Sequence, residues 1–211
     1  GGANIVEFDG MVFSVILPEY FLVTLELGFD KDNTALFMLD SRGRDTAALT
    51  RVDLETGEQA VLAADDKADI QGILTDQRTL EPVAYNVDYL KSSWYGLTDE
   101  VAADFATLTE QLEGSLSIVS TTEDMSKWVV YEDASERPGA YYVYDRENGS
   151  VSQMLVTRPA LSDVTLAPMQ PVVIESRDGL NLVSYLTLPA ESDADGDGRP
   201  DARLPLVLAV H

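Results

Sequence analysis

Short apolar segments separated by turn residues are the dominant pattern of the first 160 or so residues. Leu36–Leu39, Trp128–Tyr131 and Tyr141–Tyr144 are apolar at consecutive positions instead of alternate ones. Apolar runs of strand length without alternation are typical of β-strands that are covered on both faces. The pattern therefore predicts a mainly β chain whose strands are stacked between other layers.

The strand pattern also repeats. An acidic turn that leads into an apolar strand occurs at Phe29–Phe37 and again at Thr122–Val129. A strand, an aspartate and a turn closed by glycine occur at Arg51–Glu58 and again at Tyr144–Ser150. Glycine supplies the positive φ that such turns need. Both signatures recur after the same shift, because 124 − 32 = 92 and 145 − 53 = 92.

A middle copy of the acidic turn lies at Thr75–Leu80, between the apolar segments Ile70–Leu74 and Val83–Val87. Aligned on its aspartate, it follows the first copy by 76 − 32 = 44 residues and precedes the third by 124 − 76 = 48. A period in the forties with several strands per unit is typical of β-propeller blades. A β-sandwich with similar hairpins is the alternative, and the equal shifts favour the propeller. We predict a partial β-propeller of about three blades over residues 1–161.

One helix is predicted as an insertion between the strands. Thr98 is a suitable N-cap, and Asp99 and Glu100 follow it at the positive end of the helix dipole. Apolar residues at helical spacing form one stripe: Val101, Phe105, Leu108 and Leu112. Gly114 is placed to end the helix. We favour an insertion packed on a sheet over a lid across the propeller face.

The sequence changes character at about residue 162. Residues 162–171 read as a linker, and a hairpin with its turn at Arg177–Gly179 is predicted over Val172–Leu188. Leu204–Val210 is apolar apart from one proline and predicts a buried strand of an α/β sheet. Because a folded domain rarely ends on an unpartnered buried strand, we expect residues 172–211 to be the truncated start of a second domain.

The chain is strongly acidic, with 14 basic and 37 acidic residues and a net charge of −23. Nucleic acids and anionic membrane surfaces are bound by clustered Lys and Arg, so both are disfavoured as partners. There is no cysteine, which removes disulfides, thiolate metal sites and cysteine nucleophiles. No apolar run is long enough for a transmembrane helix, and no signal peptide is visible. These features do not assign a compartment.

An acidic loop near the end of the chain is a candidate Ca²⁺ site. Asp193, Asp195, Asp197 and Asp201 fall at positions 1, 3, 5 and 9 of a calcium loop, and Gly196 falls at position 6. The bidentate glutamate expected at position 12 is absent, because Leu204 stands there. A solvated acidic turn is the alternative interpretation.

Two arginines and three aromatic residues have a functional and a structural interpretation each. Arg42 and Arg44 could hold a substrate carboxylate or carbonyl with their forked donors, or could pair with nearby acids on a blade edge. The excess of acidic residues favours the pairing. Trp94, Tyr95 and Trp128 are expected in the blade core and not in a ligand-binding cage.

Four stretches together resemble the prolyl oligopeptidase family of serine peptidases, in its dipeptidyl- and acylaminoacyl-peptidase-like branch. They are a propeller segment, a linker, a hairpin with its exit, and a final strand: Ser41–Leu49, Met169–Val172, Ser176–Leu180 with Tyr185–Pro189, and Leu204–His211. The resemblance covers nearly the whole chain. It implies a propeller that caps an α/β-hydrolase domain and filters short peptides by size.

In that family a serine, a histidine and an aspartate perform the hydrolysis. The resemblance places all three beyond this chain. His211, the only histidine, matches the first residue of the family's His-Gly-Gly-Pro motif, which implies a role beside the oxyanion-binding loop. No Gly-x-Ser-x-Gly sequence occurs. We therefore expect no cofactor requirement, oligopeptides as substrates of the intact protein, and no activity of this chain alone.

Two other functions remain open: a non-enzymatic propeller that serves as a binding scaffold, and a calcium-stabilised extracellular interaction module. An incomplete propeller exposes strand edges, which can pair with another copy. Self-association is therefore expected.

Overall fold

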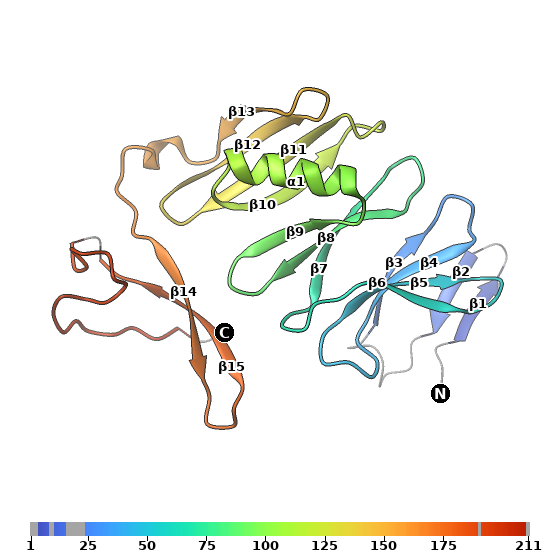
Figure 1. The fold of residues 1–211 in the computed structure, drawn as a ribbon, viewed down its shortest axis with the longest axis horizontal. Helices are drawn as coiled ribbons and strands as arrows, with labels where there is room; N and C mark the ends of the chain where they lie inside the picture. Colours follow the sequence, from blue (N-terminus) through green and yellow to red (C-terminus); the bar gives the residue numbers. More distant parts are fainter. Residues whose placement is uncertain (1–3, 9–10, 16–23, 190, 210–211) are drawn as a thin grey trace.

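The computed structural model describes residues 4–8, 11–15, 24–189 and 191–209. Three antiparallel sheets follow one another along it (Figure 1). Blade 1 contains β3–β6, blade 2 contains β7–β9 and blade 3 contains β10–β13. Their strands run over Thr24–Phe29, Ala35–Asp40, Ala48–Asp53 and Gln59–Ala63 for blade 1, Ile70–Thr75, Pro82–Asp88 and Ser92–Gly96 for blade 2, and Ser115–Thr121, Lys127–Ala134, Arg137–Asp145 and Ser150–Val156 for blade 3.

In each blade every strand pairs with the next strand along the chain. Two hairpins flank the blades: β1 (Asn4–Phe8) with β2 (Met11–Val15), and β14 (Met169–Glu175) with β15 (Asn181–Thr187). Among the described residues, helix α1 (Asp99–Gln111) follows blade 2 directly, and a short 3₁₀ helix (Pro159–Leu161) follows blade 3. The predicted mainly β fold of about three blades with one helical insertion is confirmed.

Blades 1 and 3 repeat each other in their irregularities as well as in their strands. The β3–β4 ladder has a bulge between Glu26 and Gly28, and the β10–β11 ladder has one between Ile118 and Ser120. The β5–β6 and β12–β13 ladders also have bulges, at Leu49/Thr50 and Tyr141/Tyr142. Each pair is separated by 92 residues, since 118 − 26 = 92 and 141 − 49 = 92. A bulge alters strand twist and direction, so the two blades bend at the same places.

The turns repeat with the same shift. Asn33 and Met125 have positive φ, at 55° and 61°, and so do Gly57 and Gly149, at 72° and 67°. Only glycine adopts this conformation without strain, and the β5–β6 and β12–β13 turns both have a glycine there. The 92-residue repeat predicted from the sequence is therefore present in the backbone.

The alignment of the middle copy needs a correction of two residues. The Asp76 N–H donates to the Glu81 carbonyl oxygen across the β7–β8 turn (2.9 Å), five residues ahead. The equivalent closing bonds are Asp30 to Ala35 (3.1 Å) and Thr122 to Lys127 (2.9 Å). Asp76 thus corresponds to Asp30 and not to Asp32. The two shifts become equal, because 76 − 30 = 46 and 122 − 76 = 46.

The blades pack face to face through two shared apolar cores. Leu39 and Leu49 of blade 1 meet Ile70 and Val87 of blade 2 in one cluster. The larger cluster joins blade 2, α1 and blade 3, with Trp128 fully buried in it. All six residues of β4 are buried, and they include the apolar run Leu36–Leu39 that predicts a strand covered on both faces. In β12 the covering is only partial, since Tyr141 and Tyr142 are half-buried.

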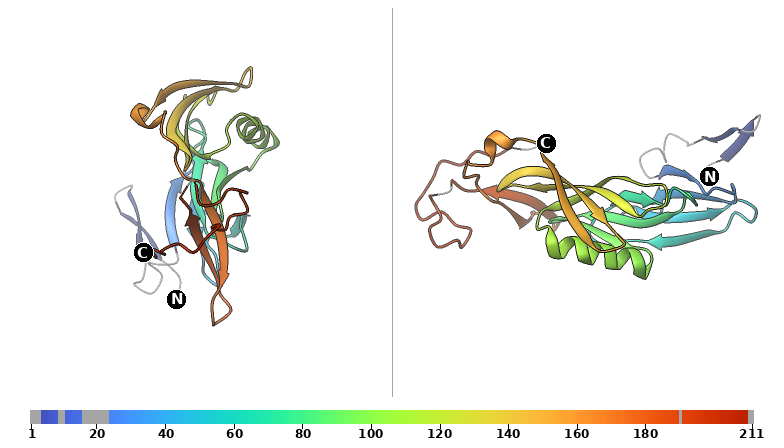
Figure 2. Two further views of the ribbon diagram at one scale, coloured as in Figure 1. Left: turned by 90° about the vertical axis from the view of Figure 1, so that its left-hand side faces the viewer. Right: turned by 90° about the horizontal axis from the view of Figure 1, so that it is seen from above.

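Helix α1 begins as predicted and ends earlier. The Thr98 hydroxyl accepts the Val101 N–H at 3.3 Å, and all four residues of the predicted apolar stripe are buried. The helix lies against blade 2, beside β9, and packs into the apolar cluster that is shared with blade 3 (Figures 1 and 2). Its last residue is Gln111, and Leu112 caps it in an extended conformation. Gly114 therefore does not form the C-cap.

The C-terminal part agrees with the sequence in its hairpin and differs elsewhere. The β14–β15 hairpin is formed, with Gly179 at φ +84° in its turn. Met169–Pro171, predicted in the linker, belongs to β14 because its backbone pairs with Tyr185–Thr187. Residues 204–209 have no regular secondary structure, and Val207 is 90 % exposed. The predicted buried strand is not formed there, because a strand needs a neighbouring edge to pair with. Across the described residues, no helix is long and apolar enough to span a membrane.

Candidate functional site

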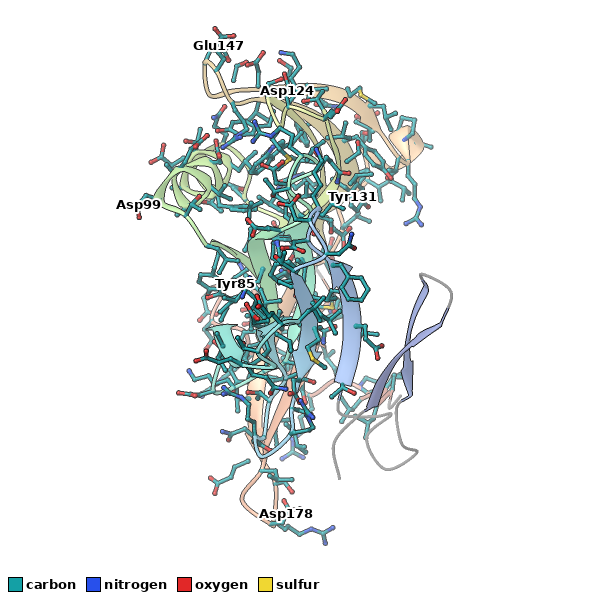
Figure 3. The ribbon with its side chains drawn as sticks, turned by 90° about the vertical axis from the view of Figure 1, so that its right-hand side faces the viewer. Tyr85, Asp99, Asp124, Tyr131, Glu147 and Asp178 are labelled. Atoms are coloured by element: carbon teal, nitrogen blue, oxygen red, sulfur yellow. The ribbon has the colours of Figure 1, made fainter. Side chains whose placement is uncertain are left out.

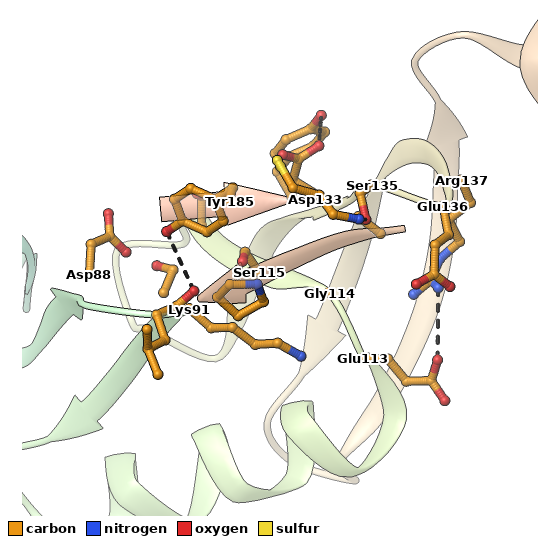
Figure 4. A pocket seen from close by; sticks show the side chains of 17 residues that line it. Asp88, Lys91, Glu113, Gly114, Ser115, Asp133, Ser135, Glu136, Arg137 and Tyr185 are labelled. Carbon is orange, nitrogen blue, oxygen red and sulfur yellow. Dashed lines mark hydrogen bonds and ion pairs between the residues drawn. The ribbon is translucent and has the colours of Figure 1, made fainter. Parts of the chain in front are cut away.

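A pocket of about 630 Å³ lies between blade 2, blade 3 and the C-terminal hairpin (Figure 4). Its walls come from the β8–β9 turn, the start of β10 with the residues that precede it, the β11–β12 turn and the outer residues of the hairpin. The β8–β9 and β11–β12 turns connect the second and third strands of their blades. Because antiparallel strands alternate in direction, these turns emerge on the same side of the stacked blades.

Two hydrogen bonds connect the hairpin to the turns around this pocket. The Met169 N–H donates to the Ser135 hydroxyl at 3.0 Å, and the Tyr185 hydroxyl donates to the Leu90 carbonyl oxygen at 3.4 Å. The first bond reaches blade 3 and the second reaches blade 2. The hairpin therefore lies across both blades and closes one side of the pocket.

A buried carboxylate lies behind the pocket wall. Glu132 forms an ion pair with the Arg137 Nη2 (2.6 Å) and accepts hydrogen bonds from the Gly114 N–H (2.9 Å) and the Tyr142 hydroxyl (3.2 Å). Its side chain is only 3 % exposed. Burial, together with the nearby Glu132 charge, raises the pKa of Tyr142. Three donors thus compensate a charge that would otherwise be costly to bury.

Gly114 is required at its position by the close approach of β11. A Cβ atom there would lie 2.4 Å from the Asp133 carbonyl oxygen and 2.7 Å from Cγ of Glu132. Any larger residue would push β11 away and separate the Gly114 N–H from the Glu132 carboxylate. Gly114, which the sequence predicted to end the helix, therefore allows its N–H to reach the buried Glu132 carboxylate.

Charged side chains of both signs line the pocket. The acids are Asp88, Glu113, Asp133 and Glu136, and the bases are Lys91 and Arg137. Arg137 carries ion pairs to Glu132 and Glu113. Lys91 has no hydrogen bond or ion pair with another described residue, and its side chain extends along the pocket (Figure 4). The pocket can contact a polar, charged ligand such as a short peptide.

The sequence reasoning did not find Glu132, although the repeat contains the signal for it. Glu132 lies 92 residues after Asp40, and Asn86 lies between them at 46 residues from each. All three are buried polar residues near the end of the second strand of their blade. Asn86 donates to the Ser92 hydroxyl at 2.7 Å and to the Ser93 carbonyl oxygen at 3.1 Å. Shifting the position of Asp40 by 46 and by 92 residues would have identified Asn86 and Glu132.

The two arginines predicted as candidate substrate contacts lie in the β4–β5 turn. Arg42 forms a two-point ion pair with Asp40, with Nη2 to Oδ2 at 2.6 Å, as the second interpretation predicts. Burial opposes ionisation of Asp40, but the hydrogen bonds from Arg42 lower its pKa, and the charge of Arg44 adds to this. Arg78 and Asp76 make the same arrangement in blade 2. Substrate contact by Arg42 and Arg44 stays a prediction.

A polar network fastens α1 to blade 3. Asp104 of the helix accepts the Tyr144 hydroxyl (2.8 Å) and Arg146 (2.6 Å), and Arg146 also pairs with Glu100 (2.7 Å). Burial, then the hydrogen bond to Asp104, raises the pKa of Tyr144 to about 12. The Arg146 guanidinium lies over the Trp128 ring at 5.2 Å. These contacts hold α1 as a fixed part of the blades.

The aromatic residues expected in the core divide into two groups. Trp128 is fully buried, and Trp94 stacks on Phe105 while its Nε1 donates to the Leu116 carbonyl oxygen at 2.9 Å. Tyr95 is 46 % exposed and stacks on Tyr85. The prediction is therefore wrong for Tyr95, because this strand, β9, is the outermost of its sheet.

The acidic loop gathers three of the four candidate calcium ligands. Carboxylate oxygens of Asp193, Asp195 and Asp197 lie within 4.8 Å of one another. Asp193 also accepts the N–H groups of Asp197 and Gly198, both at 3.0 Å. Asp201 instead accepts the Ala194 N–H at 3.1 Å. This arrangement fits a solvated turn as well as an ion site, so calcium stays a prediction. His211 lies outside the described residues.

Two curated proteins are similar to this chain in sequence. Dipeptidyl aminopeptidase BIII of Pseudoxanthomonas mexicana is 39 % identical over 220 residues, which covers 100 % of this chain and 31 % of that protein. Dipeptidyl peptidase family member 6 of Caenorhabditis elegans is 28 % identical over 197 residues, covering 89 % of this chain and 26 % of that protein. The chain thus spans about a third or less of the length of these relatives. No protein-family model matches it.

Solved structures share the fold at low sequence identity. Dipeptidyl peptidase 4 of Porphyromonas gingivalis matches 81 % of this chain and 24 % of its own, with a TM-score of 0.53 and 9 % identity. Prolyl oligopeptidase B of Galerina marginata matches 77 % of this chain and 23 % of its own, with a TM-score of 0.51 and 14 % identity. The resemblance inferred from sequence motifs is confirmed.

Proposed function

We propose that this chain, a segment of a prolyl oligopeptidase-family protein, forms the part of a serine peptidase that controls access of short peptides to the active site. The relative with 39 % identity over the whole chain is named as a dipeptidyl aminopeptidase. In this proposal, residues 1–161 belong to the propeller, the linker predicted at 162–171 is shortened to 162–168 by the pairing of β14, and residues from 169 to 211 belong to the beginning of the hydrolase domain. The Ser-His-Asp triad lies outside this chain.

The observation that carries the proposal is the position of the pocket. It lies where the blade turns meet the hairpin that leads out of the blades. A peptide approaching a catalytic centre on the hydrolase side would pass these turns. The polar, mixed-charge lining suits a peptide backbone with charged termini better than an apolar ligand.

The test uses the full-length protein and peptides of increasing length. We expect hydrolysis of short chromogenic peptides that a serine-directed phosphonate blocks, and a steep loss of kcat/KM for peptides of several tens of residues. Ser135→Ala and Tyr185→Phe remove the two bonds that hold the hairpin against the blades. Both variants should cut long peptides better, with little change for short ones.

Equal rates for short and long peptides in the wild type would contradict the gating role. Absence of any phosphonate-sensitive hydrolysis would favour the alternative, a propeller that serves only as a binding scaffold. We expect this chain alone to be inactive in the same assay. Self-association through exposed strand edges stays a prediction, and light scattering tests it.

A further inference from the structure

The guanidinium of Arg137 has one fixed side and one open side. On the fixed side its Nη2 lies 2.6 Å from Oε1 of Glu132, whose side chain is 3 % exposed. On the open side its Nη1 lies 3.8 Å from Oε2 of Glu113, whose side chain is 89 % exposed. The open side belongs to the pocket wall, and a dashed line in Figure 4 marks its ion pair with Glu113.

The fixed side makes this arginine a rigid donor. Glu132 is held by the Gly114 N–H and the Tyr142 hydroxyl as well as by Arg137. Separating Arg137 from the buried Glu132 carboxylate would strongly destabilise the fold, so the two side chains stay paired. The guanidinium is therefore oriented before any ligand arrives, and little side-chain entropy is lost when one binds.

The open side is held only loosely. An exposed ion pair at 3.8 Å contributes little, because water screens it and the long side chains lose freedom in making it. Glu113 has no other ion pair with a described residue. It is thus a carboxylate that an incoming carboxylate can replace without changing the charge beside Arg137.

We propose that the pocket binds a carboxylate group of a peptide at Arg137, where the ligand displaces Glu113. Lys91, a cation of the pocket lining with no partner among the described residues, provides the second positive charge. The carboxylate is either the C-terminus of the peptide or an acidic side chain. That the ligand is a peptide rests on the proposed function, whereas the carboxylate chemistry rests on Arg137 and Glu113.

The remaining acids of the pocket oppose the binding of a carboxylate. Asp88, Asp133 and Glu136 also line the pocket and repel an anion. A carboxylate would therefore avoid this pocket unless Arg137 and Lys91 attract it directly. The same acids provide a control, because neutralising one that does not contact Arg137 tests general electrostatics alone.

The experiment measures binding by calorimetry or NMR to the full-length protein, with probes too short to contain a bond between two amino acid residues. Acetyl-alanine carries a terminal carboxylate, acetyl-glutamate α-amide carries a side-chain carboxylate, and acetyl-alanine amide carries none. We expect either or both acids to bind and the neutral amide to bind at least about tenfold more weakly. Which acid binds more tightly identifies the source of the carboxylate.

Variants at the two sides of Arg137 should change affinity in opposite directions. Glu113→Gln removes the internal competitor and should tighten acid binding by up to about fivefold. Arg137→Lys keeps the charge next to Glu132 but loses the fork, and should weaken binding by about tenfold. If Arg137→Lys does not fold, the double variant Glu132→Gln with Arg137→Met removes the buried pair together and should weaken binding by at least as much.

Asp88→Asn is the matched control. It makes the same charge change as Glu113→Gln in the same pocket, and Asp88 forms no ion pair with a described residue (Figure 4). We expect it to tighten acid binding less than twofold, because it removes only a repulsion that water and salt already screen. Equal effects of the two variants, or equal binding of the acids and the amide, would overturn the inference. Because the experiment measures binding and not turnover, this result is independent of whether the protein is a peptidase.

Discussion

Blades 1 and 3 have the same backbone bulges and turns but different core side chains. The bulges and positive-φ turns recur after 92 residues, yet the residues at equivalent core positions have very different sizes. Leu36 corresponds to Trp128 and Val52 corresponds to Tyr144, and all four are buried. Blade 3 packs its aromatic rings against α1, whereas the buried residues of the corresponding cluster in blade 1 are Leu36, Met38 and Val52. The repeat therefore preserves the places where the chain bends and turns, while core volume follows the neighbouring element.

Blades 1 and 3 also differ in how the acid at one equivalent buried position is paired. Asp40 is paired with Arg42, two residues ahead, and its side chain is 11 % exposed. Glu132 is paired with Arg137, five residues ahead, and its side chain is 3 % exposed. Each acid keeps a backbone donor when the arginine side chain is substituted, the Arg42 N–H for Asp40 and the Gly114 N–H for Glu132, both at 2.9 Å, so the deeper burial of Glu132 makes the difference. Loss of the arginine should therefore lower the free energy of unfolding more in blade 3 than in blade 1.

The largest effect should come from removing the Arg137 guanidinium. We expect Arg137→Met to lower the free energy of unfolding by about 3–5 kcal/mol, because it leaves the buried Glu132 charge without its cation. Arg42→Met, the equivalent change in blade 1, should cost about 1 kcal/mol. Chemical unfolding of the two variants measures the difference.

The double variant Glu132→Gln with Arg137→Met checks the cause. It removes the unpaired charge and should recover most of the stability lost in Arg137→Met. If the double variant were as unstable as the single one, the loss would come from packing of the arginine stem and the comparison of the two acids would be wrong.

The next effect tests the difference in core volume. Trp128→Leu gives blade 3 the residue of blade 1, and should cost about 3 kcal/mol, because a buried aromatic side chain is lost together with its contacts to Phe105 and Tyr144. The reverse change, Leu36→Trp, should cost about 1–3 kcal/mol or more through overpacking. Thermal unfolding of both variants measures this. Neutral behaviour of either one would show that the two cores are interchangeable.

Much of the fold could be predicted because the repeat depends on local chemistry. Apolar runs of strand length, the Thr-Gly and Asn-Gly turns and the cap at Thr98 each act within a few residues. The two-residue error at Asp76 arose because aspartates were aligned by type. The structure aligns them by the hydrogen bond that closes the turn.

The candidate site could not be predicted in the same way, because it joins residues that are distant in sequence. Glu132 meets Gly114 across two strands, and the pocket adds Lys91 and Tyr185 from other elements. Apolarity alone also failed for residues 204–209, since an apolar run becomes a strand only beside an edge that it can pair with. Local rules predicted the blades, and contacts between blades made the pocket.

A smaller effect separates the polar network of blade 3 from its apolar packing. Tyr144→Phe keeps the ring and removes the hydroxyl that donates to the buried Asp104 at 2.8 Å, so we expect a loss of about 1–2 kcal/mol. Val52 of blade 1 has no such group. Tyr141→Phe, in the same strand, is the control, because no hydrogen bond joins its hydroxyl to another described residue. Equal loss in both variants would mean that Asp104 is satisfied by Arg146 alone.

The smallest effect concerns the turn that precedes the second strand of blade 3, where Figure 3 labels Asp124. Hydrogen bonds from the Thr122 hydroxyl, the Ser126 N–H and the Ser126 hydroxyl lower the pKa of Asp124 to about 2, from an ordinary value of 3.8. A carboxylate whose pKa is depressed in the folded state stabilises the fold above its ordinary pKa, and this stabilisation is lost as the pH falls through about 2.

Asp124→Asn should remove this share of the acid sensitivity. The melting temperature of the variant should therefore fall less steeply than that of the wild type between pH 5 and pH 2, although other aspartates with lowered pKa, among them Asp30 and Asp40, still contribute. Asp124 is exposed, so water screens its interactions and the difference should be small. Parallel curves would show that the three hydrogen bonds do not favour the charged form. The repeat would then preserve the path of this turn through its backbone bonds alone.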